Sequence, residues 1–120
     1  MDITQTIARL KAEPGFTENV GMMLIHNGVV RGWSRADGRE VTAVEVQVDQ
    51  DRIEALRREY EQKPGIFRVI IEACEGRLQP GDDLLFMVVA GALREDVKPV
   101  LAELLDRVKA EAVTKSEAVV

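Results

Sequence analysis

The sequence has 120 residues, a mass of 13.3 kDa and 46% hydrophobic residues, which is enough for one domain with one apolar core. A formal net charge of −5 and an isoelectric point near 4.9 argue against sequence-independent nucleic-acid binding, which needs a basic face. Aromatic residues make up 4% of the chain, and no apolar run approaches the roughly 20 residues that span a bilayer. We therefore expect neither a nucleic-acid nor a membrane partner.

The opening residues predict a helix and then a long strand. Asp2 and Gln5 have the spacing of a capping box, and Pro14-Gly15 marks the end of the helix. The apolar run over residues 21–32 is interrupted by Gly28, which indicates a strand that is bent or bulged.

A second strand follows a turn at Asp37-Gly38. Valines alternate with polar residues over positions 44–48, so this strand should have one buried and one solvated face. With the turn between them, the two strands are expected to form a hairpin.

The second half of the chain gives clearer signals. Asp49 or Asp51 can cap a helix that runs to about Gln62, and residues 66–73 form a third predicted strand. Pro80-Gly81 suits a type II turn.

After that turn, residues 84–90 predict a strong strand and residues 94–111 a helix with one apolar face. We therefore expect a single α+β domain over residues 1–112, with element order αββαββα and a mostly antiparallel sheet. Residues 113–120 are expected to be a tail with no core pattern of its own.

Several kinds of chemistry have no motif in this sequence. There is no phosphate-binding loop, no glycine-rich dinucleotide motif, no cysteine pair and no H-E-x-x-H zinc motif. We expect no metal and no cofactor. The single histidine, His26, and the single cysteine, Cys74, are interpreted as structural or surface residues. Because Cys74 cannot form an internal disulfide and the opening residues lack a secretory signal pattern, we expect a cytoplasmic location.

A cationic stripe is predicted along the last helix. Arg94, Lys98 and Lys109 project in one sector beside the apolar face. In one interpretation their stems cover apolar surface while their charged ends are solvated. In the other, Arg94 holds a phosphate or carboxylate, and a partly desolvated Lys109 acts as nucleophile or proton carrier.

Three sequence segments follow one another along the chain: NGVVRG, GRLQPGDDLLFMVVAGALRED and DRVKAEAVTKSE. Together, over about residues 21–117, they resemble the large subunit of molybdopterin synthase, the MoaE family. The resemblance implies an α/β-hammerhead fold and a homodimer. It also implies a small ubiquitin-like (MoaD-like) partner, whose C-terminal thiocarboxylate gives sulfur to a cyclic pyranopterin monophosphate during molybdenum cofactor biosynthesis.

The resemblance assigns roles to four residues. Lys109 matches the lysine of the family's helix-ending D-x-x-K, and Lys115 matches its second lysine, one position early, so both are implied to be catalytic. Arg31 matches the arginine of G-x-V-R and Arg94 that of an H-R pair, so both are implied to bind the anionic substrate. The histidine of that pair is Leu93 here.

Three functions stay open at this point. The first is a sulfur-transferring enzyme subunit that uses these four residues. The second is a MoaE-like binding module without catalysis, serving assembly or regulation of cofactor synthesis, which the change at Leu93 favours. The third is a small α+β domain whose basic stripe is only a solvated surface.

Overall fold

Two three-stranded antiparallel sheets and four helices make up the computed structural model, which describes residues 2–120. In chain order the elements are α1 (Ile3–Lys11), α2 (Phe16–Asn19), β1 (Met22–Val29), β2 (Val41–Val48), α3 (Gln50–Glu61), β3 (Ile66–Ala73), β4 (Gly76–Leu78), β5 (Asp83–Gly91), α4 (Arg94–Glu111) and β6 (Val113–Val119).

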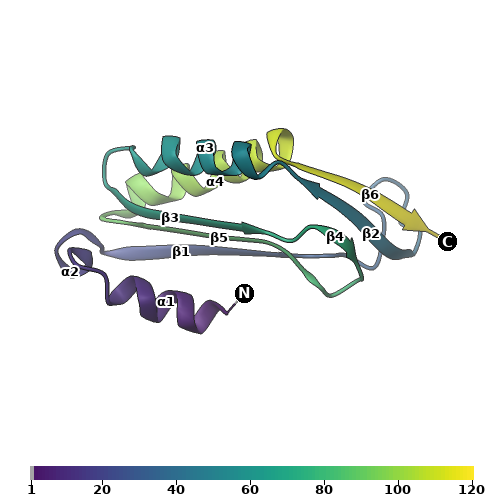
Figure 1. Ribbon diagram of the computed structural model, residues 1–120, viewed down its shortest axis with the longest axis horizontal. Coiled ribbons are helices and arrows are strands. Elements are labelled where there is room, and N and C mark those ends of the chain that lie inside the picture. Colours follow the sequence, from purple (N-terminus) through teal and green to yellow (C-terminus); the bar gives the residue numbers. More distant parts are fainter. Residues whose placement is uncertain (1) are drawn as a thin grey trace.

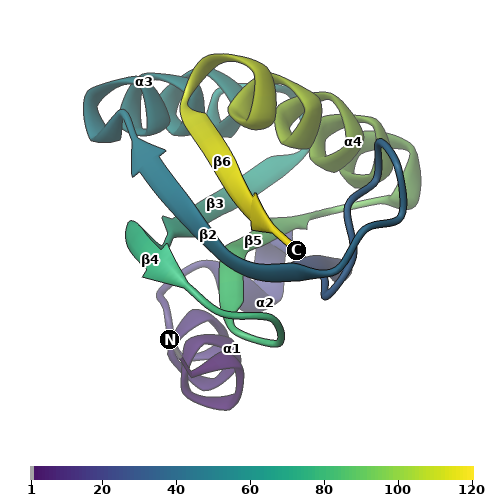
Figure 2. The ribbon, with the colours of Figure 1, turned by 90° about the vertical axis from the view of Figure 1, so that its right-hand side faces the viewer.

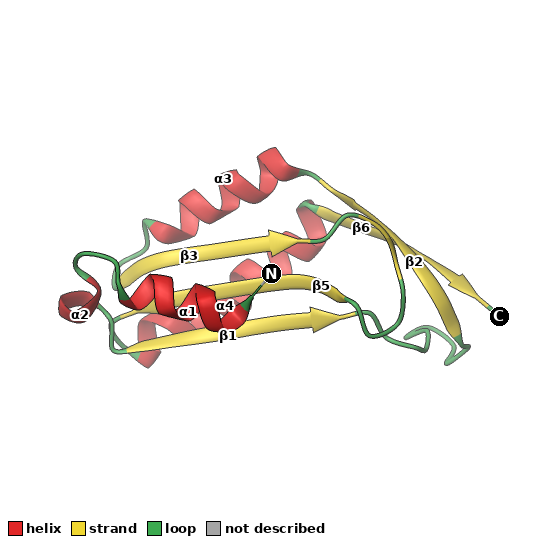
Figure 3. Ribbon diagram, turned by 60° about the horizontal axis from the view of Figure 1, so that its bottom comes forward, coloured by secondary structure: helices red, strands yellow, loops and turns green. Residues whose placement is uncertain are grey.

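The first sheet has the strand order β1-β5-β3 and lies between two helical layers. Helices α3 and α4 cover one face, and α1 with α2 lies on the other (Figures 1 and 3). The central strand β5 is buried from Leu84 to Gly91, which explains its unbroken apolar sequence. The expected mixture of helices with antiparallel strands is therefore confirmed.

The second sheet has the order β4-β2-β6 and lies in front of the first in the view of Figure 2. Its central strand β2 buries Val44 and Val46 and exposes Glu45 and Gln47 between them. This is the alternation that the sequence predicted, and the buried face joins the core beneath α3 and α4.

Local signals placed most helix and turn boundaries correctly. Asp2 accepts a hydrogen bond from the Gln5 backbone N–H at 3.1 Å, and Asp49 accepts one from Arg52 N–H at 3.0 Å. At the Pro80-Gly81 turn, Gly81 has a φ of +92°, the left-handed value that a type II turn requires. Both predicted helix caps and the turn are confirmed.

The predicted hairpin of β1 with β2 is wrong. Strand β1 pairs with β5, whereas β2 pairs with β4 and β6. Strand β5 is apolar on both faces and needs a neighbour along each edge, and β1 fills one of these edges. Between the two strands, residues 30–40 carry the chain to the second sheet, where one bridge joins Trp33 to Glu40.

Residues 113–119, which the sequence analysis separated as part of a tail, form strand β6. This strand pairs with β2 from Val113 opposite Val48 to Val119 opposite Val41. Its side chains are mostly exposed, so it carries no apolar periodicity by which sequence analysis could detect it. The short elements α2 and β4 were also not predicted.

Candidate active site

A pocket of about 500 Å³ is lined by residues of both sheets and of the last turn of α4. Its walls come from β1 and the segment after it, from β2 and β5, and from α4 and β6. The polar and charged side chains among its lining residues are those of His26, Arg31, Lys109, Thr114, Lys115 and Glu117.

Strand β1 shapes the floor of this pocket. Met22 and Leu24 pack into the core beneath α3 and α4, and strand alternation places His26 and Gly28 on the same face. Gly28 has no side chain to fill the space under the end of α4. The pairing of β1 with β5 shifts register between Gly28 and Val29, which confirms the predicted irregularity. The chain then turns and brings Arg31 to the pocket.

Helix α4 supplies Lys109 from its last turn. Val97, Leu104 and Val108 on the helix are fully buried, and they fix its orientation against the sheet. Lys109 follows Val108 directly and therefore lies at the edge of this buried stripe, where it lines the pocket.

Strand β6 supplies Lys115 and Glu117. Lys115 is held by the pairing of its backbone opposite Val46 of β2. Burial lowers the pKa of the Lys115 amine, and the positive charges of Arg31 and Lys109 lower it further. Lys115 is therefore easier to deprotonate than a lysine without these neighbours.

Arg31 is held from two sides. Its Nη2 lies 3.9 Å from Oε2 of Glu117, and its guanidinium carbon is 5.0 Å from the ring centroid of Trp33. An arginine stacked on an aromatic ring and facing a carboxylate has a restricted orientation. Arg31 therefore presents a fixed positive charge to the pocket.

Arg94 lies elsewhere in the same chain. It is exposed at the start of α4, 15 residues before Lys109, or roughly 22 Å along a helix that rises 1.5 Å per residue. Lys98 is also exposed and outside the pocket lining. The structure thus brings Arg31, Lys109 and Lys115 together at one pocket, whereas Arg94 and Lys98 lie outside its lining.

His26 is a pocket residue that the sequence analysis interpreted as a structural or surface residue. The alternation of residues 22–28 could have placed it on the α4 face of the sheet, but nothing local indicates that Gly28 leaves a space there. Cys74 is half-buried and does not line the pocket.

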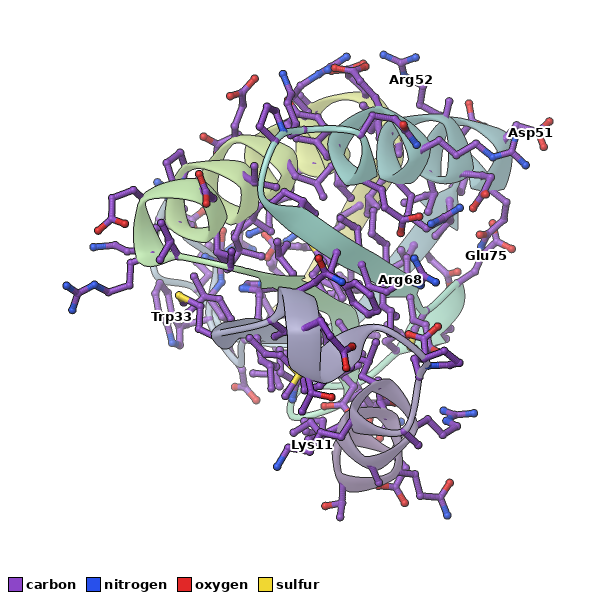
Figure 4. The ribbon with its side chains drawn as sticks, turned by 90° about the vertical axis from the view of Figure 1, so that its left-hand side faces the viewer. Lys11, Trp33, Asp51, Arg52, Arg68 and Glu75 are labelled. Atoms are coloured by element: carbon purple, nitrogen blue, oxygen red, sulfur yellow. The ribbon has the colours of Figure 1, made fainter. Side chains whose placement is uncertain are left out.

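Away from the pocket, several cations are paired with carboxylates within a helix or between a strand and a neighbouring segment. Arg68 on β3 donates to Glu13 at 3.1 Å, and it lies between α3 and α1 (Figure 4). Arg57 of α3 pairs with Glu61 at 2.7 Å. These cations lie closer to their carboxylates than Arg31 does to Glu117, at 3.9 Å, so they are less suited to bind an external anion.

The part of the chain that the structure describes, residues 2–120, contains no group of three or more His, Cys, Asp or Glu residues suited to a metal ion. Over the same residues, no helix is both long and apolar enough to cross a membrane.

The fold and the pocket define a class: a small α+β protein whose sheets and last helix enclose a cationic cleft. Residues 1–111 match the family model described as MoaE protein. The chain therefore belongs to the MoaE family, which provides the catalytic subunit of molybdopterin synthase in molybdenum cofactor biosynthesis.

Solved structures agree with this membership. Molybdopterin synthase from Staphylococcus aureus superposes with a TM-score of 0.80 at 18% identity, over 100% of this chain and 86% of that one. Molybdopterin cofactor biosynthesis protein E from Burkholderia multivorans gives a TM-score of 0.76 at 25% identity, over 100% of this chain and 82% of that one. A chain in the complex of subunits 1 and 2 of the molybdopterin-converting factor from Helicobacter pylori gives a TM-score of 0.72 at 14% identity. This match covers 98% of this chain and 80% of that one. No curated protein matches the sequence.

Proposed function

We propose that this protein is a cytoplasmic sulfurtransferase. In this proposal it accepts the thiocarboxylated C-terminus of a small ubiquitin-like partner and passes the sulfur to cyclic pyranopterin monophosphate. The observation that carries the proposal is the convergence of Arg31, Lys109 and Lys115 from three separate parts of the chain on one pocket. The Helicobacter pylori complex of two subunits, which has the same fold, supports the small partner.

The charge distribution suits these ligands. The chain as a whole carries a formal charge of −5, yet the pocket contains three cations and one carboxylate, that of Glu117. A cleft of one sign concentrates ligands of the opposite sign even on a protein of opposite net charge. A phosphorylated pterin and a thiocarboxylate both need such positive charge.

The two lysines suit the acyl chemistry. The thiocarboxylate sulfur bonds to a carbon of the pterin as an oxygen substituent leaves that carbon. Attack of a nucleophile on the acyl carbon then breaks the acyl–sulfur bond and leaves the sulfur on the pterin as a thiolate. A neutral lysine amine can take the proton from an attacking water, which frees the partner's C-terminus as a carboxylate. It can also attack the acyl carbon itself, in which case the resulting amide must be hydrolysed before the next turnover. We assign this role to Lys109, with Lys115 beside it as a second amine.

We further propose a homodimer, and this proposal gives Arg94 a place. Because Arg94 is roughly 22 Å along α4 from Lys109, it can join an anion site of this kind only from a second copy. Light scattering at micromolar concentration should give twice 13.3 kDa, and a monomer throughout that range would contradict the dimer.

The decisive test is reconstitution with a thiocarboxylated partner and the pyranopterin, following the dithiolene product. Lys109→Arg should retain the fold and partner binding but lose turnover, because a guanidinium stays protonated and is not nucleophilic. Lys98→Arg on the same helix, outside the pocket, is the matched control and should turn over normally.

Two outcomes would change the assignment. Turnover of Lys109→Arg at the wild-type rate would refute the proposed mechanism. A wild-type protein that binds both ligands without forming product would instead favour the non-catalytic binding module.

A further inference from the structure

The position of His26 on strand β1 directs its side chain into the pocket. It lies on β1 opposite Met87 of β5, on the face beneath α4, and it lines the pocket together with Lys109. Its ring leans along the strand over Gly28, where an added Cβ would come 3.0 Å from Nε2. Gly28 therefore leaves room for the imidazole to occupy the floor of the pocket.

The two ring nitrogens of His26 have different surroundings. Nε2 is buried and has no hydrogen-bond partner. Nδ1 is not buried in this way, and it also makes no hydrogen bond within residues 2–120. A buried N–H without a partner is rarer and more costly than a buried lone pair without one. The favoured neutral tautomer therefore carries its proton on Nδ1, the nitrogen that is free to meet a ligand.

The neighbouring groups differ from His26 in charge. Lys109 comes from α4, Lys115 and Glu117 from β6, and Arg31 follows β1. Arg31 is five residues beyond His26, at most about 16 Å along an extended chain. An anionic group bound to Arg31 can thus lie at one end of the pocket while His26 contacts another part of the same ligand.

We infer that His26 is a ligand-binding residue, whose Nδ1–H donates a hydrogen bond to an uncharged acceptor, a ring nitrogen or carbonyl oxygen, of the pterin ring system. This inference rests on the proposed function, because it takes the pyranopterin as the ligand. The cations select for the anionic group, and a neutral donor adds selectivity for the ring, since a site built to hydrogen-bond discriminates against ligands without the matching atom. Burial and the charge of Lys109 both lower the pKa of His26, which keeps the ring neutral at pH 7.

The first test uses the fact that the chain has one histidine. Selective ¹⁵N labelling of histidine therefore gives one imidazole to observe by NMR. At pH 7.5 we expect a neutral ring protonated at Nδ1, with the Nδ1 resonance shifting when cyclic pyranopterin monophosphate is added. A ring protonated at Nε2 in the complex would overturn the inference.

The second test compares three substitutions by calorimetry. His26→Asn places its amide N–H near the position of Nδ1, His26→Gln places it near Nε2, and His26→Phe keeps a ring without a donor. We expect His26→Asn to bind cyclic pyranopterin monophosphate within about threefold of wild type, and the other two about tenfold more weakly, the effect of one lost hydrogen bond. All three should bind inorganic phosphate like wild type, because phosphate lacks the ring.

The outcomes separate this inference from the proposed function. If wild type and His26→Phe bind the pyranopterin equally well, the role of His26 is refuted and the proposed function stands. If wild type binds inorganic phosphate but not the pyranopterin, both are refuted. Thermal unfolding of each variant checks that a weaker affinity does not arise from a damaged fold.

Discussion

The guanidinium of Arg31 and the carboxylate of Glu117 form an ion pair in the pocket, with 3.9 Å between Nη2 and Oε2. Arg31 follows β1 in the first sheet, and Glu117 is on β6 in the second, so the pair links the two sheets. An incoming anion must either bind Arg31 together with Glu117 or displace the Glu117 carboxylate from Arg31.

Glu117→Gln should therefore strengthen anion binding. Both side chains are about one-third exposed, so the ion pair is worth at most about 1 kcal/mol, which corresponds to a two- to fivefold gain in affinity. Calorimetric titration with inorganic phosphate measures this gain. Glu45→Gln, which removes an exposed pair with Arg77 outside the pocket, is the control. Weaker phosphate binding by Glu117→Gln would mean that Glu117 positions Arg31 instead of competing for it.

Two substitutions should shift the pKa of Lys115 in opposite directions. Its pKa is lowered from 10.5, mainly by burial and then by Arg31 and Lys109, whereas Glu117 raises it. Replacing Arg31 with Met should move the titration midpoint up, and Glu117→Gln should move it down. Competitive acylation across pH 7–11, read by mass spectrometry of the peptide containing Lys115, reports the midpoint. Equal midpoints in both variants and wild type would show that these charges do not act on Lys115.

The same lowered pKa has a consequence for stability. The folded chain releases the Lys115 proton at lower pH than the unfolded chain, so its protonated form opposes folding at neutral pH. This unfavourable contribution should diminish as pH rises from the folded pKa toward 10.5, where the unfolded side chain also loses its proton.

Two glycine substitutions should distinguish effects on ligand binding in the pocket from effects on the stability of the core. At Gly91 an added Cβ would overlap Gly65 O and lie 2.7 Å from Cγ2 of Val97, so Gly91→Ala should destabilise the protein by about 1–3 kcal/mol. At Gly28 the nearest atom is His26 Nε2 at 3.0 Å, which can yield by a small ring movement. We expect Gly28→Ala to unfold in urea near the wild-type midpoint while binding the pyranopterin several-fold more weakly. A large loss of stability in Gly28→Ala would contradict this division.

Local sequence signals determined the elements that depend on local interactions. The cap at Asp49, the turn at Pro80-Gly81 and the apolar face of α4 each involve residues close together in the chain, and the structure has all three. Burial of β5 on both faces was also evident, because it requires a continuous apolar run. Family membership followed from the order of three short phrases in the sequence, and the matching family model confirms it.

Strand pairing and the composition of the pocket were decided by the tertiary structure. The pairing of β1 with β5 and the recruitment of β6 by β2 depend on backbone hydrogen bonds between distant segments, which leave no periodic pattern in a strand as exposed as β6. Helical periodicity placed Arg94 and Lys109 in one sector, but it could not show that the rise of the helix separates them by about 22 Å. His26, Lys109 and Lys115 line one pocket because strands of both sheets and the end of α4 pack together there, and that packing joins segments far apart in the chain.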